Sequence, residues 1–163
     1  MKRILAVLLA VMMLVAIVPA TSLAERASNE RGNPVYHVAT QSDPLRLRSG
    51  PGTSYRIIAR LERGQAVIKI GSSGNWYKVR TPKGLVGYAS KNYLKGNAHA
   101  NVETQKDGLH VRNKPNGGTI YYTIPHGAKG ITVYRVDGNW AQVSYNGKKK
   151  GWASLTYLRF TTW

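Results

Sequence analysis

Short runs of apolar and β-branched residues, separated by Gly, Pro and Asn, follow one another between residues 35 and 159. Apolar positions do not recur at spacings of three and four, so the pattern predicts strands rather than helices. About five or six short strands in a unit of about 60 residues favour a small β-barrel, because closure removes exposed sheet edges. The expected strands are 35–40, 45–48, 57–61, 66–70, 76–80, 85–89, 102–105, 109–112, 121–124, 130–136, 140–145 and 151–153.

The same pattern occurs twice, with each residue 64 positions from its counterpart. A repeat of this kind indicates tandem copies of one structural unit. We therefore predict one domain at 35–95 and a second at 99–159, joined by a connector at 96–98 that is too short to be a flexible tether. A short turn that closes each copy is expected to plug the end of its barrel. The repeated segments are Gly74-Asn75-Trp76 and Gly138-Asn139-Trp140, Gly87-Tyr88-Ala89-Ser90 and Gly151-Trp152-Ala153-Ser154, and the closing pairs Tyr93-Leu94 and Tyr157-Leu158.

Strand alternation places each Trp of the repeat beside polar residues. Trp76 shares its strand face with Lys78 and Arg80, and Trp140 shares its face with Gln142. The polar neighbours mark this face as the solvent side, which predicts an outward Trp in each unit. Packing of each Trp against a neighbouring loop is the alternative. The candidate ligand-binding residues are Trp76, Tyr55, Lys78, Arg80, Tyr88, Trp140, Tyr121, Tyr122 and Trp152.

Residues 1–24 have the three parts of a cleaved secretory leader. Lys2 and Arg3 begin it, and Ser22-Leu23-Ala24 supplies small residues for cleavage. The apolar run at 4–18 has 15 residues, fewer than the roughly 20 that span a bilayer. We predict cleavage, a secreted mature chain, and no membrane span after the leader is lost. Residues 25–34 are polar and are predicted to form a flexible linker.

Charge narrows the choice of partner. The 24 Lys and Arg residues outnumber 7 Asp and Glu, which gives a net charge of +17. Loss of Lys2 and Arg3 with the leader leaves +15, since no acid lies in the first 24 positions. Such a chain is attracted to polyanions in a salt-dependent way. Nucleic acid, anionic lipid and anionic wall polymer all qualify, and the densest cationic run is 148–150.

No catalytic constellation is evident in the sequence. The 4 His residues are scattered, and there is no Cys to serve as a nucleophile or a thiolate ligand. A wall glycosidase needs two carboxylates about 5–9.5 Å apart, whereas Glu62, Glu103, Asp107 and Asp137 fall in turns or at strand ends. We therefore predict that the chain is not an enzyme and that it uses no cofactor and no metal.

The combined motifs resemble the bacterial Src-homology-3-like (SH3-like) domain, over about 120 residues. Unit two departs from unit one in the loop that contains Lys114, where unit one has Gly50. The motifs are Leu45-Arg46-Leu47-Arg48-Ser49-Gly50-Pro51-Gly52-Thr53-Ser54-Tyr55, Gly74-Asn75-Trp76-Tyr77-Lys78-Val79 and Gly87-Tyr88-Ala89-Ser90, with Leu109-His110-Val111-Arg112, Gly138-Asn139-Trp140 and Gly151-Trp152-Ala153-Ser154 in unit two. The resemblance implies a partly open β-barrel that serves as an exported recognition module, similar to the wall-targeting parts of peptidoglycan hydrolases. Arg48 and Arg112 are expected to hold the loop that follows each of them.

The expected fold is therefore all-β, with two tandem SH3-like β-barrels after a cleaved signal peptide. The expected function is non-catalytic adhesion to the bacterial cell wall, with peptide stems of peptidoglycan over Trp76 and Trp140 and anionic polymer, such as teichoic acid, on the cationic surface. Recognition of a partner protein in the cell envelope is the first alternative. Nucleic-acid binding is the second, and the predicted leader argues against it.

Overall fold

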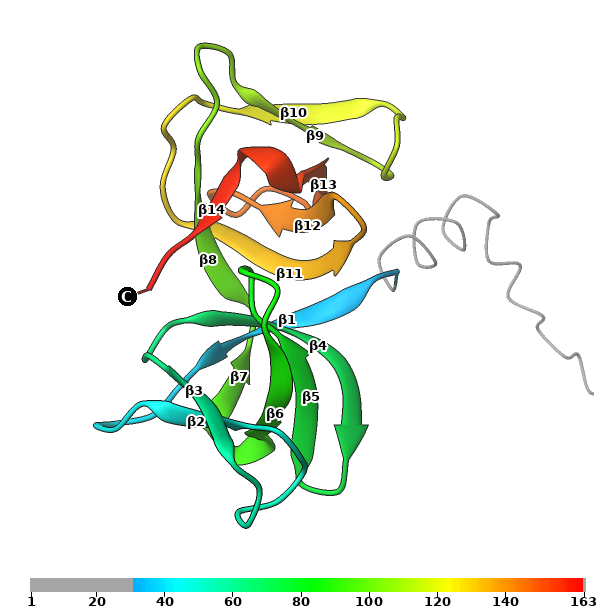
Figure 1. The fold of residues 1–163 in the computed structure, drawn as a ribbon. Helices are drawn as coiled ribbons and strands as arrows, with labels where there is room; N and C mark the ends of the chain where they lie inside the picture. The colour runs from blue at the N-terminus through cyan, green and yellow to red at the C-terminus, as the bar shows by residue number, and fades with distance from the viewer. Residues whose placement is uncertain (1–30, 163) are drawn as a thin grey trace, which may run out of the picture.

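The computed structural model describes residues 31–162, so the predicted signal peptide and most of the predicted linker lie outside the described residues. The described residues form strands and two short 3-10 helices, η1 and η2, which confirms the all-β class (Figure 1). None of them belongs to a helix that is long and apolar enough to cross a membrane. We refer to residues 33–96 as the first half and to residues 98–160 as the second half.

The elements of the two halves occur in the same order. The first half contains β1 (Asn33–Val38), β2 (Leu45–Arg48), β3 (Ile57–Leu61), β4 (Ala66–Ser73), β5 (Trp76–Arg80), β6 (Val86–Ser90), η1 (Lys91–Tyr93) and β7 (Leu94–Gly96). The second half contains β8 (Ala98–Val102), β9 (Leu109–Arg112), β10 (Ile120–Ile124), β11 (Ile131–Asp137), β12 (Trp140–Ser144), β13 (Gly151–Ser154), η2 (Leu155–Tyr157) and β14 (Leu158–Phe160).

The strands of the two halves also pair in the same way. β1 pairs with β4 and β7, and the sheet continues from β4 through β5, β6 and β2 to β3. β8 pairs with β11 and β14, and the sheet continues from β11 through β12, β13 and β9 to β10. The 64-residue repeat of the sequence is therefore also a repeat of strand topology.

One strand joins the halves into a single 14-stranded sheet. Asn33 and Pro34, at the start of β1, pair with Val136 and Arg135 of β11, and the rest of β1 pairs with β4 and β7. β1 lies in the middle of the molecule, between the two sets of strands (Figure 1). The segment predicted as a flexible linker therefore ends in two residues of paired strand.

The predicted closure of each copy into a barrel is wrong, because the sheet is open. β10 and β3 are the two ends of its strand order. A tight turn, in which Gln65 N–H donates to Glu62 O at 3.0 Å, leads from β3 into β4 without pairing these strands. The turn at Pro125 and Ala128 separates β10 from β11 in the same way.

The larger of two hydrophobic clusters crosses the junction between the halves. Val35, Ala66 and Ile68 of the first half belong to the cluster that fills the second half. A smaller cluster, which includes Leu47 and Val79, fills the first half alone. Burial of apolar side chains contributes about 25 cal/mol per Å², so the shared cluster stabilises the halves in one arrangement.

The predicted plugs are only half correct. Leu94 and Leu158 are buried at 7% and 8% exposure and do close the ends of the two clusters. Tyr93 and Tyr157, which end η1 and η2, are 49% and 45% exposed. The Tyr and the Leu differ in exposure because the 3-10 turn ends at the Tyr and the next strand begins at the Leu. The Leu side chain then points inward, and the preceding Tyr stays outside.

Candidate functional site

Two open grooves, one in each half, are built from equivalent residues. The first groove has a volume of about 770 Å³ and lies between the 39–46 segment, Trp76 and η1. The second groove has a volume of about 710 Å³ and lies between the 104–110 segment, Trp140 and Tyr157. Every residue that lines the second groove has a counterpart 64 positions earlier in the first. The shared pairs include Thr40 and Thr104, Gln41 and Gln105, Asp43 and Asp107, Arg48 and Arg112, Trp76 and Trp140, Ser90 and Ser154, and Tyr93 and Tyr157.

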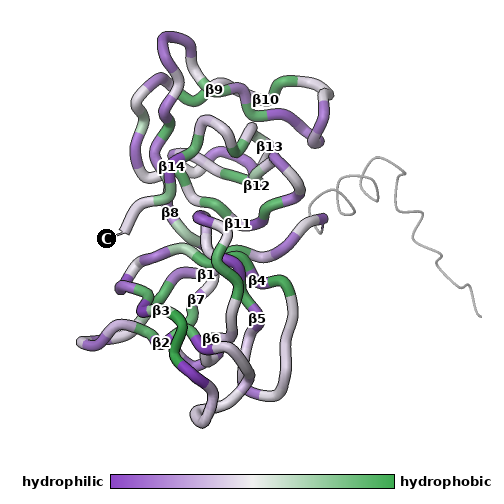
Figure 2. Tube along the Cα trace, viewed as in Figure 1, coloured by the Kyte–Doolittle hydropathy of each residue, from purple (hydrophilic) through white to green (hydrophobic). Residues whose placement is uncertain are grey.

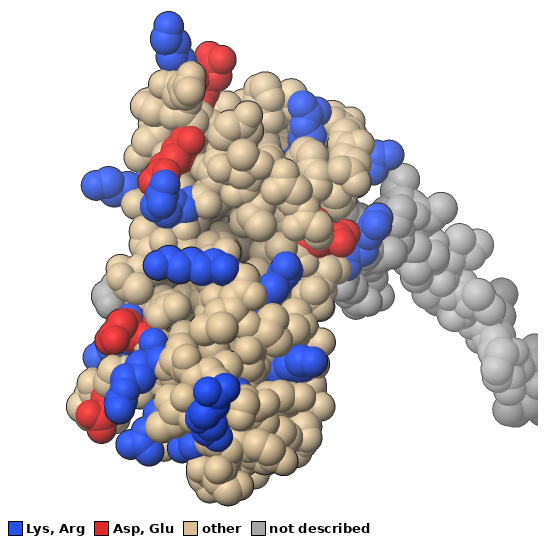
Figure 3. Space-filling model, viewed as in Figure 1, with Lys and Arg blue, Asp and Glu red and all other residues tan. Residues whose placement is uncertain are grey.

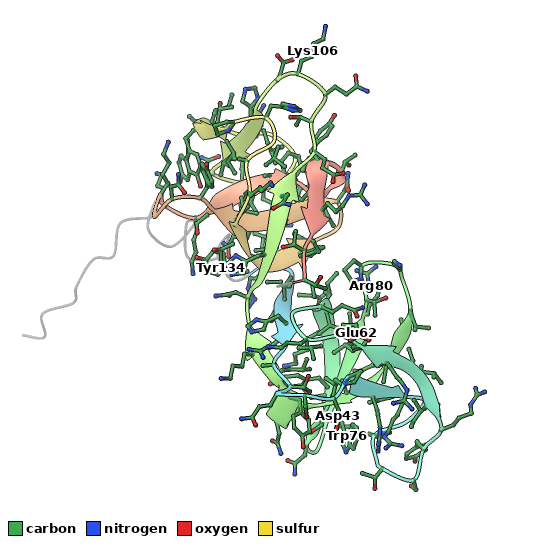
Figure 4. The ribbon with its side chains drawn as sticks, turned by 90° about the vertical axis from the view of Figure 1, so that its left-hand side faces the viewer. Asp43, Glu62, Trp76, Arg80, Lys106 and Tyr134 are labelled. Carbon is green, nitrogen blue, oxygen red and sulfur yellow. The ribbon has the colours of Figure 1, made fainter. Side chains whose placement is uncertain are left out.

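Three kinds of side chain meet in the first groove. Trp76 begins β5 and is half-buried, and Tyr93 is exposed at the end of η1, so both offer ring surface to the first groove. Asp43 lies in the loop before β2, on the same side as Trp76 (Figure 4). Arg46 adds a cation. Aromatic rings, a carboxylate and a guanidinium together can bind a short peptide that carries both an amine and a carboxylate.

The loop segments that border the grooves are polar. The segment between β8 and β9 is mainly hydrophilic (Figure 2), and it carries Lys106 at the tip of the second half (Figure 4). The second groove has His110 where the first has Arg46, and Lys106 where the first has Ser42. The grooves therefore share a plan but differ in the cations at their rims.

Arg48 holds the loop that follows β2, as the sequence predicts. Its guanidinium Nη1 donates to the carbonyl oxygens of Thr53 and Tyr55, each at 2.7 Å, and the side chain is only 8% exposed. In the second half, Arg112 Nη1 donates to Gly118 O at 2.8 Å. Thr53 lines the first groove, so Arg48 fixes one of its walls.

The two groove tryptophans differ in their hydrogen bonding. Trp140 donates its indole N–H to Asn116 Oδ1 at 2.8 Å, so a loop residue occupies this donor. Within residues 31–162, the indole N–H of Trp76 has no such partner. The first groove consequently retains a donor that a ligand can use.

The prediction that each Trp lies on a solvent-facing side of its strand is correct for β5 and wrong for β12. In β5, Lys78 and Arg80 are exposed while Val79 is buried, as the alternation predicts. In β12 the prediction is wrong, because Gln142 is buried at 2% exposure. Gln142 pairs with Trp152 across β12 and β13, so both faces of this strand are covered.

Most of the other predicted ligand residues lie outside the grooves. Trp152, whose direction strand alternation does not decide, is the largest fully buried side chain among the described residues, so it is not a ligand residue at the surface. Tyr55 is 48% exposed, and its ring lies against Gly50, which leaves no room for a side chain there. The remaining predicted residues line neither groove, and they are Lys78, Arg80, Tyr88, Tyr121 and Tyr122.

Three lysines of the β12–β13 turn each lie over a tyrosine ring. The Nζ atoms of Lys148, Lys149 and Lys150 are 5.0, 3.2 and 4.0 Å from the ring centres of Tyr122, Tyr121 and Tyr134. Burial raises the pKa of Tyr122 above its usual value. Tyr121 and Tyr122 therefore pack against the lysines of this turn instead of lining a groove. Figure 3 shows that further Lys and Arg side chains are spread over both halves on the visible face.

The sequence analysis missed two pairs of groove residues. Tyr93 and Tyr157 were expected in the turns that plug the barrel ends, and Asp107 was expected only as a residue of a turn or a strand end. Both tyrosines belong to the repeated segments, and Asp43 and Asp107 are 64 positions apart, so their repetition was the available signal. The repeat alone could not show that these residues face a common groove.

Comparison with known proteins identifies part of the chain. Residues 43–95 match the family model of the bacterial SH3 domain. This match contains β2 to β7 and most of the first groove.

Curated relatives of the chain carry amidase names. It is 28% identical over 137 residues to a Bacillus subtilis (strain 168) protein named as an N-acetylmuramoyl-L-alanine amidase (YrvJ), an alignment that covers 73% of this chain and 26% of that protein. It is 30% identical over 88 residues to a Staphylococcus aureus protein named as a probable cell wall amidase (LytH), over 54% of this chain and 28% of that one. The chain thus spans about a quarter of the length of these relatives.

The solved structures that resemble the chain include NlpC2 from Trichomonas vaginalis, with a TM-score of 0.46 and 15% identity over 79% of this chain and 48% of that one. The relatives correct one prediction. The sequence analysis excluded an enzyme, whereas these relatives of the chain are named as amidases. The prediction that the chain lies outside the enzymes is therefore contradicted.

Proposed function

We propose that the chain binds the bacterial cell wall, with a peptide stem of peptidoglycan in each groove. The single observation that carries this proposal is the repeated groove, in which a Trp, a Tyr, an Asp and an Arg recur at equivalent positions. The names of the relatives support it, because an N-acetylmuramoyl-L-alanine amidase acts where a peptide is joined to a wall sugar. The described residues recognise this substrate, and amidase activity of the whole protein is a separate part of the proposal.

The proposal includes the domain organisation and location of the chain. Two tandem SH3-like units, at 35–95 and 99–159, follow a cleaved signal peptide at 1–24, and the mature chain is secreted or wall-associated. The identical strand pairing of the two halves supports the tandem units. The net charge of +17 supports attraction to an anionic envelope.

Retention on purified sacculi tests the proposal. We expect the chain to sediment with intact sacculi at about 1 M salt, where the Debye length is about 3 Å, and not with sacculi stripped of their peptides. A Trp76→Ala/Trp140→Ala variant should lose at least tenfold in affinity, whereas Lys129→Gln, outside both grooves, should bind normally. Equal retention on stripped sacculi would reject the peptide stem as the ligand.

The same material tests the two remaining parts of the proposal. Sacculi with and without teichoic acid show whether anionic polymer contributes at low salt. Release of soluble peptides from intact sacculi reports amidase activity in the protein preparation. Release without retention on the sacculi would favour transient hydrolysis over stable wall binding.

A further inference from the structure

We infer that the chain cross-bridges two separate wall strands, one held in each groove. This inference rests on the proposed function and adds a mechanical role to it. Two sites on one protein can either bind the same ligand strand or join two strands. The position of the grooves in the sheet is the reason for inferring that the chain joins two strands.

The grooves lie toward opposite ends of the molecule. β2 supplies Leu45 and Arg46 to the first groove and stands next to the last strand at one end of the sheet order. β9 supplies Leu109 and His110 to the second groove and stands next to the last strand at the other end. β2 and β9 lie at opposite ends of the ribbon (Figure 1), and Lys106 and Asp43 of the two grooves lie far apart along the same axis (Figure 4).

The connector between the halves does not let one groove swing toward the other. Only Asn97 separates β7 from β8. Its N–H donates to Val35 O at 2.9 Å, and its carbonyl oxygen accepts from His37 Nδ1 at 2.6 Å. A flexible linker would let the two sites adapt to one strand, whereas this connector is bonded to β1 at both of its backbone groups.

The shared strand and the shared core add to this constraint. β1 pairs with β11 at Asn33 and Pro34 and with β4 from Val35 onward. Val35 and Ile68 are buried in the cluster of the second half. The two grooves therefore keep a fixed separation and direction, and two strands held at the same time would be kept at that separation.

Co-capture of two labelled wall preparations tests this inference. Sacculi fragments carrying a red or a green label are mixed, at about 1 M salt to screen charge-driven aggregation, and particles with both colours are counted. We expect the wild-type chain to raise the two-colour fraction at least fivefold above buffer. Trp76→Ala and Trp140→Ala should each still bind fragments but should lower the two-colour fraction to background.

Two controls keep the result interpretable. Tyr93→Ala and Tyr157→Ala remove exposed groove residues and serve if a Trp variant fails to fold. An equimolar mixture of the two single-groove variants should also fail to couple the colours. Coupling by that mixture, or by either single variant, would overturn the inference, because it would show that self-association joins the fragments.

The outcomes also separate this inference from the proposed function. If the wild-type chain binds fragments of each colour without coupling them, the bridging role is wrong and wall binding stands. If it binds neither, the proposed function fails and the bridging role fails with it. Lys129→Gln, which lies outside both grooves, should couple as well as the wild type.

Discussion

Trp76 and Trp140 occupy the same position in the repeat but do not offer the same chemistry. Trp140 donates its indole N–H to Asn116, while the N–H of Trp76 has no partner within the described residues. A ligand in the first groove can accept this hydrogen bond without breaking another. We therefore expect the first groove to discriminate more sharply among wall peptides.

Replacement of each Trp by Phe measures this difference, because both variants keep an aromatic ring, lose the same part of the indole and differ in whether a donor open to ligand is removed. We expect Trp76→Phe to weaken peptide binding about twofold to tenfold, since a net hydrogen bond contributes about 0.5–1.5 kcal/mol. Trp140→Phe should change affinity by less than about twofold. Titration calorimetry with a soluble wall peptide, in a background where Tyr157→Ala or Tyr93→Ala silences the other groove, separates the two. Equal losses would contradict the assignment.

Arg48 and Arg112 form a second matched pair at the residue scale. Arg48 is buried and donates to two carbonyl oxygens, whereas Arg112 is half-exposed and donates to one. Hydrogen bonds from charged donors contribute about 1.5–3 kcal/mol when buried. We expect Arg48→Ala to lower the free energy of unfolding by about 3 kcal/mol and Arg112→Ala by about 1 kcal/mol. Urea unfolding measures both, and a larger loss for Arg112 would refute this account.

Alternation along a strand predicts a residue's environment only where one face of that strand stays open. It is correct for β5, where Lys78 and Arg80 are exposed. It fails for β12, because Trp152 and Gln142 are both buried on a face that the sequence marks as polar. A buried Gln cannot be told from a surface Gln without knowing what packs above it.

At the scale of elements, one glycine of each repeat lets two strands approach closely. A Cβ on Gly87 of β6 would lie 2.7 Å from Leu47 Cγ and 2.9 Å from Arg48 O of β2. A Cβ on Gly151 of β13 would lie 2.5 Å from Val111 Cγ1 of β9. The glycines therefore keep β2 and β9, which carry groove residues, in place.

Gly87→Ala should destabilise the chain by about 1–3 kcal/mol, the usual cost of overpacking. Gly96→Ala is the matched control, because Gly96 also lies in a strand of the first half and has nothing within 4 Å of its added Cβ. We expect it to change stability by less than about 1 kcal/mol. Thermal and urea unfolding of the two variants give the comparison, and equal losses would show that close approach is not the cause.

The sequence predicted β2, β3, β5 and β9 with the bounds that the structure has. It missed β7 and β14, because strands of three residues such as Leu94-Lys95-Gly96 carry too few apolar positions for a period to show. It placed a strand at 102–105, whereas β8 runs from Ala98 to Val102, since Ala98 and Ala100 are weak strand formers that tertiary contacts bury. The grooves could not be predicted, because their walls come from segments far apart in the chain.

At the scale of the whole molecule, the shared core predicts that the halves unfold together. Val35, Ala66 and Ile68 are buried in the cluster of the second half, and β1 pairs with both halves. Loss of the first half would expose these residues and leave the edge of β11 without a partner. We therefore expect one calorimetric transition whose van't Hoff and calorimetric enthalpies agree.

Leu47→Ala tests this cooperativity from a position in the first half alone. Leu47 is fully buried in the smaller cluster, so its truncation should cost about 2–5 kcal/mol. The single transition should move to lower temperature as a whole, while Leu85→Ala, at an exposed position, should leave it almost unchanged. Two resolved transitions, of which only one moves, would contradict a shared core.

The contact between β1 and β11 is heterologous, because it joins the first strand of one half to the fourth strand of the other half. The equivalent edge of the first half, at Gly71 and Ser72 of β4, pairs with β5 on one side and has no strand on its other side within residues 31–162. Heterologous contacts do not close on themselves and can be extended. The architecture is therefore additive: a further copy of the unit can pair at this edge while both existing grooves remain unchanged.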